Sequence, residues 1–377
     1  MLRNAAWMYA KVSDGTFITS HFSAVLKDKV DGKILRNAVD TASRRFPYLM
    51  KEVCKNESRL YLVDNPRPVV IKEGSTVRLC SEESNRHLIA ITYSGKKNSF
   101  ISHHGLVDGR GIMPFRSTVL YYYCREKYDS TLEAPAQTRL YGTEIMPSEY
   151  EDPYEFAKEL AGYNEIQVHP ALPENMYNIC RDEKLERTGY HCYTYAVDSA
   201  AFMAVCKKYG GTPNTMTALL MGKIFHDRKT REDSVVIPEI YCDLRGTIGK
   251  NNGHWTCVST IQMPSYESTM NLSFEEQNAK VRGELKKGAG EESMKKMIKE
   301  WGEMGNYIEA IYIAVNTDYQ MLIEFNALHD KFFFTFVQHF DMEVYINDFM
   351  KVLEENSIPV KLIDRWEDES GRMDIVI

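Results

Sequence analysis

The residues best suited to acid–base chemistry in this 377-residue chain lie in one short segment, 103–109, which reads His-His-Gly-Leu-Val-Asp-Gly. A neutral histidine can take a proton from a hydroxyl or an amine near neutral pH. The segment 99–103 predicts the end of a strand, and 111–115 predicts the start of a helix that tolerates its proline in the first turn. Adjacent strand residues point to opposite faces, so His103 and His104 cannot serve the same pocket. We therefore expect one catalytic histidine and one that packs or anchors.

The segment 103–109 resembles the H-H-x-x-x-D-G signature of the CoA-dependent acyltransferase superfamily, with all seven positions present. That superfamily includes chloramphenicol acetyltransferases, condensation domains of peptide synthetases, plant BAHD acyltransferases and bacterial alcohol acetyltransferases. The resemblance implies that His104 is the general base, and that His103, Asp108 and Gly109 are structural parts of the active site. It also implies that neither an acyl-enzyme nor a metal is needed.

A second motif supplies a partner for the signature aspartate. Residues 240–245 read Ile-Tyr-Cys-Asp-Leu-Arg and resemble the D-L-R segment of many superfamily members, in which the arginine reaches the signature aspartate. A buried, unpaired Asp108 would be unstable, so an arginine partner is expected on physical grounds as well. Arg245 is the candidate, although Arg110 and Arg116 are nearer in sequence. The alternative is that Arg245 is a surface residue at a strand end.

The reaction that the resemblance implies forms a tetrahedral oxyanion, which needs a hydrogen-bond donor. A strand is predicted over 255–262, and its hydroxyl residues Thr256, Ser259 and Thr260 are candidates for oxyanion or substrate contact. Two features depart from the superfamily pattern. Residues 251–254 read Asn-Asn-Gly-His where relatives often carry G-N, and the D-F-G-W-G element of plant members is absent, which counts against that branch.

The elements around the motif can be predicted from periodicity. Apolar residues recur at helical spacing over 32–45, which indicates an amphipathic helix that Pro47 ends. Short strands are predicted over 59–63 and 88–93, and a hairpin connection at 94–98 leads from the second of them into the histidine strand.

Strands and helices are also predicted along the rest of the chain. Strands are predicted over 189–197, 235–245, 255–262 and 332–337, and helices over 198–210, 212–226 and 273–300, with a last one ending at 355. The order of aromatic strand, His339, acid and helix resembles a degenerate copy of the first motif. His339 is expected to be structural, because the glycines that shape the active loop are missing there.

The length of the chain is too great for one ordinary core. We expect an N-terminal half over 1–165 that carries the histidine motif, a crossover over 166–184, and a C-terminal half over 185–377 that carries D-L-R. The superfamily resemblance implies an α+β fold with two chloramphenicol-acetyltransferase-like α/β halves. Each half would be a mixed sheet covered by helices, with the active site in a tunnel between them.

Composition excludes several functional classes. The net charge of −7 offers no basic field for nucleic acid, and no apolar run is long enough for a signal peptide or a membrane span. The eight cysteines include no C-x-x-C pair, so buried reduced thiols are expected rather than disulfides or zinc. A cytoplasmic protein with no bound metal or cofactor is the expectation.

The expected reaction is acyl transfer from an acyl-CoA co-substrate to a small-molecule alcohol. No carrier or adenylation segment is visible in the chain, and an acidic carrier protein gains no long-range attraction from a net charge of −7. An alcohol suits a histidine base because a hydroxyl must lose its proton as it attacks, whereas a neutral amine is already nucleophilic.

Four alternatives stay open. The chain could be a condensation-type domain that forms amides or esters from donors bound to an acyl carrier protein, or a non-catalytic module that only docks a carrier. It could be a hydrolase with His103, His104 and Asp108 as metal ligands, which the strand geometry opposes. The spacing of His103 and Asp108 also fits the H-x-x-x-x-D motif of membrane glycerolipid acyltransferases, but no F-P-E-G-type segment follows.

Overall fold

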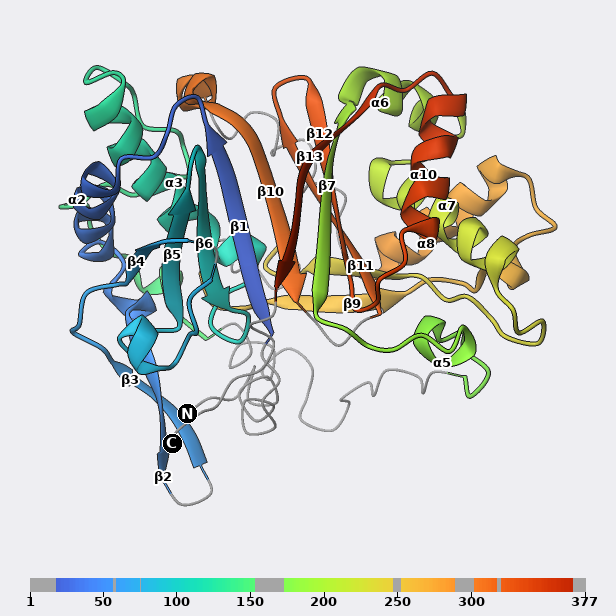
Figure 1. Ribbon diagram of the computed structural model, residues 1–377, viewed down its shortest axis with the longest axis horizontal. Coiled ribbons are helices and arrows are strands. Elements are labelled where there is room, and N and C mark those ends of the chain that lie inside the picture. Colours follow the sequence, from blue (N-terminus) through green and yellow to red (C-terminus); the bar gives the residue numbers. More distant parts are fainter. Residues whose placement is uncertain are drawn as a thin grey trace.

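The chain folds into two lobes that stand side by side, each a β-sheet with helices on its outer side (Figure 1). This computed structural model describes residues 18–56, 59–74, 76–152, 173–246, 252–288, 302–316 and 320–368. The fold is α+β, as the sequence predicts, and each lobe has its own large apolar core.

The sheet of the first lobe has the order β10-β1-β6-β5-β4. Its strands are β1 (Thr19–Leu26), β4 (Ile71–Glu73), β5 (Ile89–Ser94), β6 (Lys97–His103) and β10 (Ile308–Asn316). Strand β4 runs parallel to β5 and the other pairs are antiparallel, so the sheet is mixed. Beside it, β2 (Lys51–Asn56) and β3 (Arg59–Asp64) form a separate ribbon. The central strand β6 ends at the two histidines.

The sheet of the second lobe has the order β11-β12-β7-β13. Its strands are β7 (Tyr190–Asp198), β11 (Met321–Leu328), β12 (Lys331–Gln338) and β13 (Val360–Asp368), paired in antiparallel fashion. A further ribbon, β8 (Glu239–Asp243) with β9 (Val258–Gln262), crosses below both lobes in the view of Figure 1. This ribbon carries the D-L-R segment toward the first lobe.

The helices cover the outer side of each sheet (Figure 1). They are α2 (Gly32–Ser43) and α3 (Gly109–Lys127) on the first lobe, and α5 (Ile179–Asp182), α6 (Ser199–Lys208), α7 (Pro213–Arg228), α8 (Phe274–Gly288) and α10 (Val344–Glu355) on the second. Local signals explain their starts. Asp31 accepts hydrogen bonds from the first-turn amides of α2, and Asp198 accepts one from Ala201 at 2.8 Å as the cap of α6.

The structure corrects several predicted element boundaries. Strand β8 begins at Glu239 rather than at residue 235 and ends at Asp243 rather than at residue 245. Helix α3 begins at Gly109 rather than at residue 111, because Asp108 caps it, so Pro114 lies in the second turn and not in the first. Strand β9 begins at Val258 rather than at residue 255, since the backbone just before it is bonded to the signature loop and to Arg245 instead of to β8.

The division of the chain between lobes also has a feature that sequence patterns do not indicate. Strand β10 belongs to the segment 185–377 but adds to the sheet of the first lobe, where it pairs with β1. Residues 153–172 lie outside the described part, so the crossover over 166–184 stays a prediction. The predicted helix over 273–300 is described as far as Gly288, and residues 1–17 also lie outside the described part. None of the described helices is long and apolar enough to cross a bilayer.

Candidate active site

The two histidines of the motif occupy different environments. His103 is the last residue of β6 and is paired with Thr19 of β1. Its imidazole is buried, and its Nδ1 accepts a hydrogen bond from the Gly105 amide at 3.0 Å. Burial lowers the pKa of His103 to about 3, so the ring stays neutral at physiological pH. This histidine anchors the loop that follows.

His104 is the first residue after the strand, and it is only partly buried. Its Nδ1 lies 3.1 Å from the carbonyl oxygen of Val107. A carbonyl oxygen can only accept a hydrogen bond, so Nδ1 carries the proton in this contact and Nε2 keeps a free lone pair. Burial lowers the pKa of His104, while the bond to Val107 and the charge of Asp108 oppose that shift. The ring is therefore held as a neutral base with Nε2 as the basic atom.

Asp108 is a structural group with both oxygens engaged. Its Oδ1 accepts a hydrogen bond from the Gly111 amide at 2.7 Å, which caps α3, and its Oδ2 accepts one from the Cys257 amide at 2.7 Å. Nη2 of Arg245 lies 2.9 Å from each of the two oxygens. The side chains of Asp108 and Arg245 are each 1% exposed, so this is a buried ion pair.

Arg245 uses its whole guanidinium group. Besides Asp108 it contacts Asp243 through Nη1 at 2.9 Å, the carbonyl oxygen of Gly253 through Nε at 2.7 Å, and that of Trp255 through Nη2 at 2.5 Å. The charges of Asp108 and Asp243 raise the pKa of Arg245 although burial opposes them. The arginine thus ties the β8–β9 segment to the signature loop.

The pairing agrees with the D-L-R prediction, and the two nearer arginines are placed elsewhere. Arg110 forms an ion pair with Asp243 at 3.1 Å. Arg116 is buried inside α3, with its guanidinium 5.5 Å from the centre of the Phe22 ring. Arg245, 137 residues from Asp108 in sequence, is the one that reaches it.

Three hydroxyl residues are the sequence candidates for oxyanion or substrate contact. The Thr256 hydroxyl donates to the backbone oxygen of His104 at 2.6 Å, and the Thr256 amide donates to that of Leu106 at 3.3 Å. This use of the hydroxyl proton makes Thr256 a brace of the histidine loop. Ser259 and Thr260 lie on β9 opposite β8, and their side chains are outside the described part. Their assignment stays a prediction.

A second buried polar network lies behind the loop, and sequence reasoning missed it. Arg45 forms a bidentate pair with Glu149, with contacts of 2.9 and 2.8 Å. The Tyr48 hydroxyl donates to Glu149 at 2.8 Å and lies 2.8 Å from Nδ1 of His254. Burial opposes the shift, but hydrogen bonds from Arg45 and Tyr48 lower the pKa of Glu149 to about 2. His254 belongs to the segment 251–254, which departs from the G-N that relatives often carry. That departure was the one sequence signal for this network.

The network fits closely against the signature helix. A side-chain carbon added at Gly111 would lie 2.0 Å from the backbone oxygen of His254 and 3.2 Å from Nη2 of Arg245. Only glycine allows that approach, because the Cβ atom of any other residue would lie closer than 3.0 Å to a non-bonded backbone atom, a distance that protein structures essentially never show. Gly111 therefore lets the 252–257 segment dock on the start of α3.

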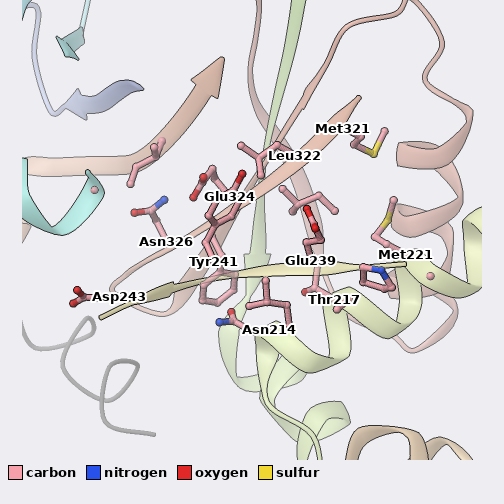
Figure 2. Close-up of a pocket in the computed structure, with 18 of the residues that line it drawn as sticks. Asn214, Thr217, Met221, Glu239, Tyr241, Asp243, Met321, Leu322, Glu324 and Asn326 are labelled. Atoms are coloured by element: carbon pink, nitrogen blue, oxygen red, sulfur yellow. The ribbon is translucent and has the colours of Figure 1, made fainter. Parts of the chain in front are cut away.

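A cavity of about 510 Å³ lies between the two lobes and reaches the start of α3, directly after the signature loop, while His104 itself is not among the residues that line it. Gly109 and Arg110 bound it from the first lobe, and residues of α7, β8 and β11 bound it from the second (Figure 2). Most of the lining residues are apolar, and the charged ones are three carboxylates and one guanidinium: Glu239, Asp243, Glu324 and Arg110. Such a mainly apolar cavity with a few polar groups is typical of a small-molecule site.

Sequence analysis did not single out the polar residues that β11 contributes to this cavity, Glu324 and Asn326. The apolar surroundings raise the pKa of Glu324 to about 7. One signal was present in the sequence, since a glutamate and an asparagine interrupt the apolar run 321–328 at alternate positions. Alternation marks one face of a strand, but it does not show what that face meets.

Comparison with known proteins identifies the fold. No protein-family model matches the sequence, and no curated protein matches it. Polyketide synthase associated protein 5 from Mycobacterium tuberculosis is a structural match with a TM-score of 0.64 and 11% identity, covering 93% of this chain and 95% of that one. TRI101 of F. sporotrichioides, complexed with coenzyme A and T-2, matches with a TM-score of 0.57 and 9% identity over 93% and 96%.

A third match is the first condensation domain of the calcium-dependent antibiotic synthetase, in complex with a substrate analogue. Its TM-score is 0.59 at 11% identity, over 93% of this chain and 92% of that one. The chain thus has, over nearly its whole length, the fold shared by these condensation domains and acyltransferase-like proteins. This is the fold that the signature at 103–109 implies.

Proposed function

We propose that this chain, which has the two-lobed fold of condensation domains and of TRI101, is an acyltransferase that moves an acyl group from an acyl-CoA to a small-molecule hydroxyl. The observation that carries the proposal is the fixed tautomer of His104. With Nδ1 donating to the Val107 carbonyl at 3.1 Å, Nε2 is left as a base in a loop that leads to Gly109, a residue of the cavity wall between the lobes.

The proposed reaction runs in two proton transfers. Nε2 of His104 takes the proton of the acceptor hydroxyl while the oxygen attacks the thioester carbonyl carbon. The C–S bond of the tetrahedral intermediate then breaks, an ester forms, and the CoA thiolate takes the proton from the imidazolium. The base is thereby restored without an acyl-enzyme and without a metal.

The rest of the site supports this chemistry by holding the loop. The Asp108–Arg245 pair fixes the backbone just after His104, and Thr256 fixes the backbone oxygen of His104 itself. A general base must lie within hydrogen-bond reach of its substrate, so a rigid loop reduces the misplacement that slows such transfers. His103, Asp108, Gly109 and Arg245 are accordingly proposed as structural parts of the site.

The donor and the acceptor rest on physical arguments. TRI101, of similar fold, was crystallised with coenzyme A, which supports a CoA thioester as the donor here. The net charge of −7 disfavours long-range attraction to an acidic carrier protein. A hydroxyl acceptor is proposed because it requires the base that His104 provides.

The test incubates the purified protein with acetyl-CoA or longer acyl-CoAs and a panel of alcohols and amines, and follows thiol release. Thiol release that depends on an alcohol is expected. Turnover only with acyl groups loaded on a carrier protein, or only with amines, would contradict the proposal and favour a condensation-type reaction. A protein that releases no thiol with any donor would be a non-catalytic docking module.

A further inference from the structure

The cavity between the lobes contains polar groups that the proposed proton transfer does not use. The side of β11 that carries Leu322, Glu324 and Asn326 faces the first lobe, because Leu322 packs against the core of that lobe. Figure 2 shows Glu324 and Asn326 together on β11, with β8 and α7 on the other side of the cavity.

Glu324 has no charge partner in the part of the chain that the structure describes. The residue opposite it on β12 is Thr335, whose hydroxyl is bonded to Thr194 at 3.0 Å. The one guanidinium of the described lining, Arg110, pairs with Asp243 instead. Glu324 is therefore a carboxylate that lies in a mainly apolar cavity without a cation of its own, and this arrangement disfavours its ionised form.

Asn326 provides an independent sign that the cavity is built for a ligand. The residue is 4% exposed, and its Nδ2 donor finds no acceptor among the described residues. On the opposite wall, Oγ1 of Thr217 on α7 is likewise buried without a hydrogen-bond partner there. Buried polar atoms are nearly always paired in folded proteins, so unpaired atoms in a cavity wall indicate groups that a ligand satisfies.

The charge of the cavity indicates which substrate it suits. With three carboxylates and one guanidinium in its described lining, the cavity is negative. The phosphates of coenzyme A are anionic, and like charges brought together cost several kcal/mol. The cavity therefore suits the acceptor rather than the nucleotide part of the donor.

We propose that this cavity binds the acceptor as a cation, an apolar molecule with a protonated amine held by Glu324 and an oxygen acceptor held by Asn326. The raised pKa of Glu324 agrees with this, since an ammonium group would relieve the unfavourable ionisation of the carboxylate. The two residues are alternate on one strand, which places their attachment points roughly 7 Å apart. The amine and the oxygen of the ligand should be separated by a similar distance.

This inference rests on the proposed function only in naming the ligand an acceptor, so its test measures binding without turnover. Isothermal titration of the protein alone compares 6-amino-1-hexanol with 1-heptanol, which has a similar length but no charge. The wild type should bind the amino alcohol at least about tenfold more tightly, the scale expected of one hydrogen bond to a charged group.

Glu324→Gln keeps the shape of the side chain and should lose that preference, while its affinity for 1-heptanol stays within about twofold. Glu309→Gln is the matched control, because Glu309 is an exposed glutamate on β10 that pairs with Lys96 outside the cavity lining. It should behave like the wild type. A preference that survives Glu324→Gln, or that is lost in Glu239→Gln instead, would overturn the assignment.

The outcomes separate this inference from the proposed function. If the wild type binds both probes equally, the cationic subsite is wrong, whatever the thiol-release assay shows. If the amino alcohol binds tightly through Glu324 but no acyl-CoA releases thiol, the subsite stands and the proposed reaction fails.

Discussion

The buried pair of Asp108 and Arg245 should be among the most important polar interactions for the stability of this protein. Removing one partner of a buried ion pair leaves the other charge unpaired, at about 3–5 kcal/mol. Asp108→Ala also removes the cap of α3, which contributes about 1 kcal/mol. Arg245 would still keep Asp243 and two backbone carbonyls, so the lower end of the range applies to the pair itself. We expect a total of roughly 4 kcal/mol.

Arg245→Met tests the same pair from the other side. Asp108 would keep the amides of Gly111 and Cys257 as donors, so a loss of about 3 kcal/mol is expected. Because the two side chains share one interaction, the double variant should be destabilised by at least about 1 kcal/mol less than the sum of the single variants. Chemical denaturation with a double-mutant cycle measures this coupling directly.

An exposed ion pair gives the control. Arg86 and Glu82 lie four residues apart, with side chains 50% and 79% exposed, so Arg86→Ala should leave the unfolding free energy close to that of the wild type. If Asp108→Ala is no more destabilising than Arg86→Ala, or if the cycle is additive within about 0.5 kcal/mol, the buried pair does not hold the loop as argued.

Three further changes test the surroundings of the site. Because burial lowers the pKa of His104, kcat/KM should rise with pH through a midpoint below the ordinary histidine value of about 6.5. A midpoint above that value would contradict the lowered pKa. Gly111→Ala should displace the 252–257 segment and lower the melting temperature, because the backbone oxygen of His254 would lie 2.0 Å from the added carbon. A melting temperature equal to that of the wild type would refute this contact. Tyr48→Phe leaves Nδ1 of His254 without its partner and removes one of the two donors to Oε2 of Glu149, so denaturation should show a loss of about 1–3 kcal/mol, and an unchanged midpoint would exclude the network.

Contiguous motifs were the part of the site that the sequence made predictable. His103, His104 and Asp108 stand within one strand-loop-helix segment, so their local geometry follows from strand alternation and helix capping. The link to Arg245 could be predicted because a buried carboxylate needs a partner and D-L-R offered one. The start of α3 was predicted two residues late, since the capping role of Asp108 was not considered.

Contacts between distant segments could not be read in this way. The Thr256 hydroxyl, a candidate oxyanion donor, donates to the backbone oxygen of His104, which is 152 positions away in sequence. In the structure it therefore holds the histidine loop. Glu324 and Asn326 lie on β11, a strand that the sequence analysis does not predict. Their place in the cavity wall depends on which lobe that strand faces. Register and lobe packing determine such contacts, and neither follows from local periodicity.

The central claim is that His104 is the general base, and one variant tests it most directly. His104→Ala should lower the rate of acceptor-dependent thiol release from acyl-CoA by roughly two to four orders of magnitude. Because the ring is partly exposed and its Nδ1 bonds to the Val107 carbonyl within the same loop, the unfolding midpoint of the variant should stay close to that of the wild type. His103→Ala should instead mainly lower stability. A His104→Ala protein that turns over at a near-normal rate would contradict the account.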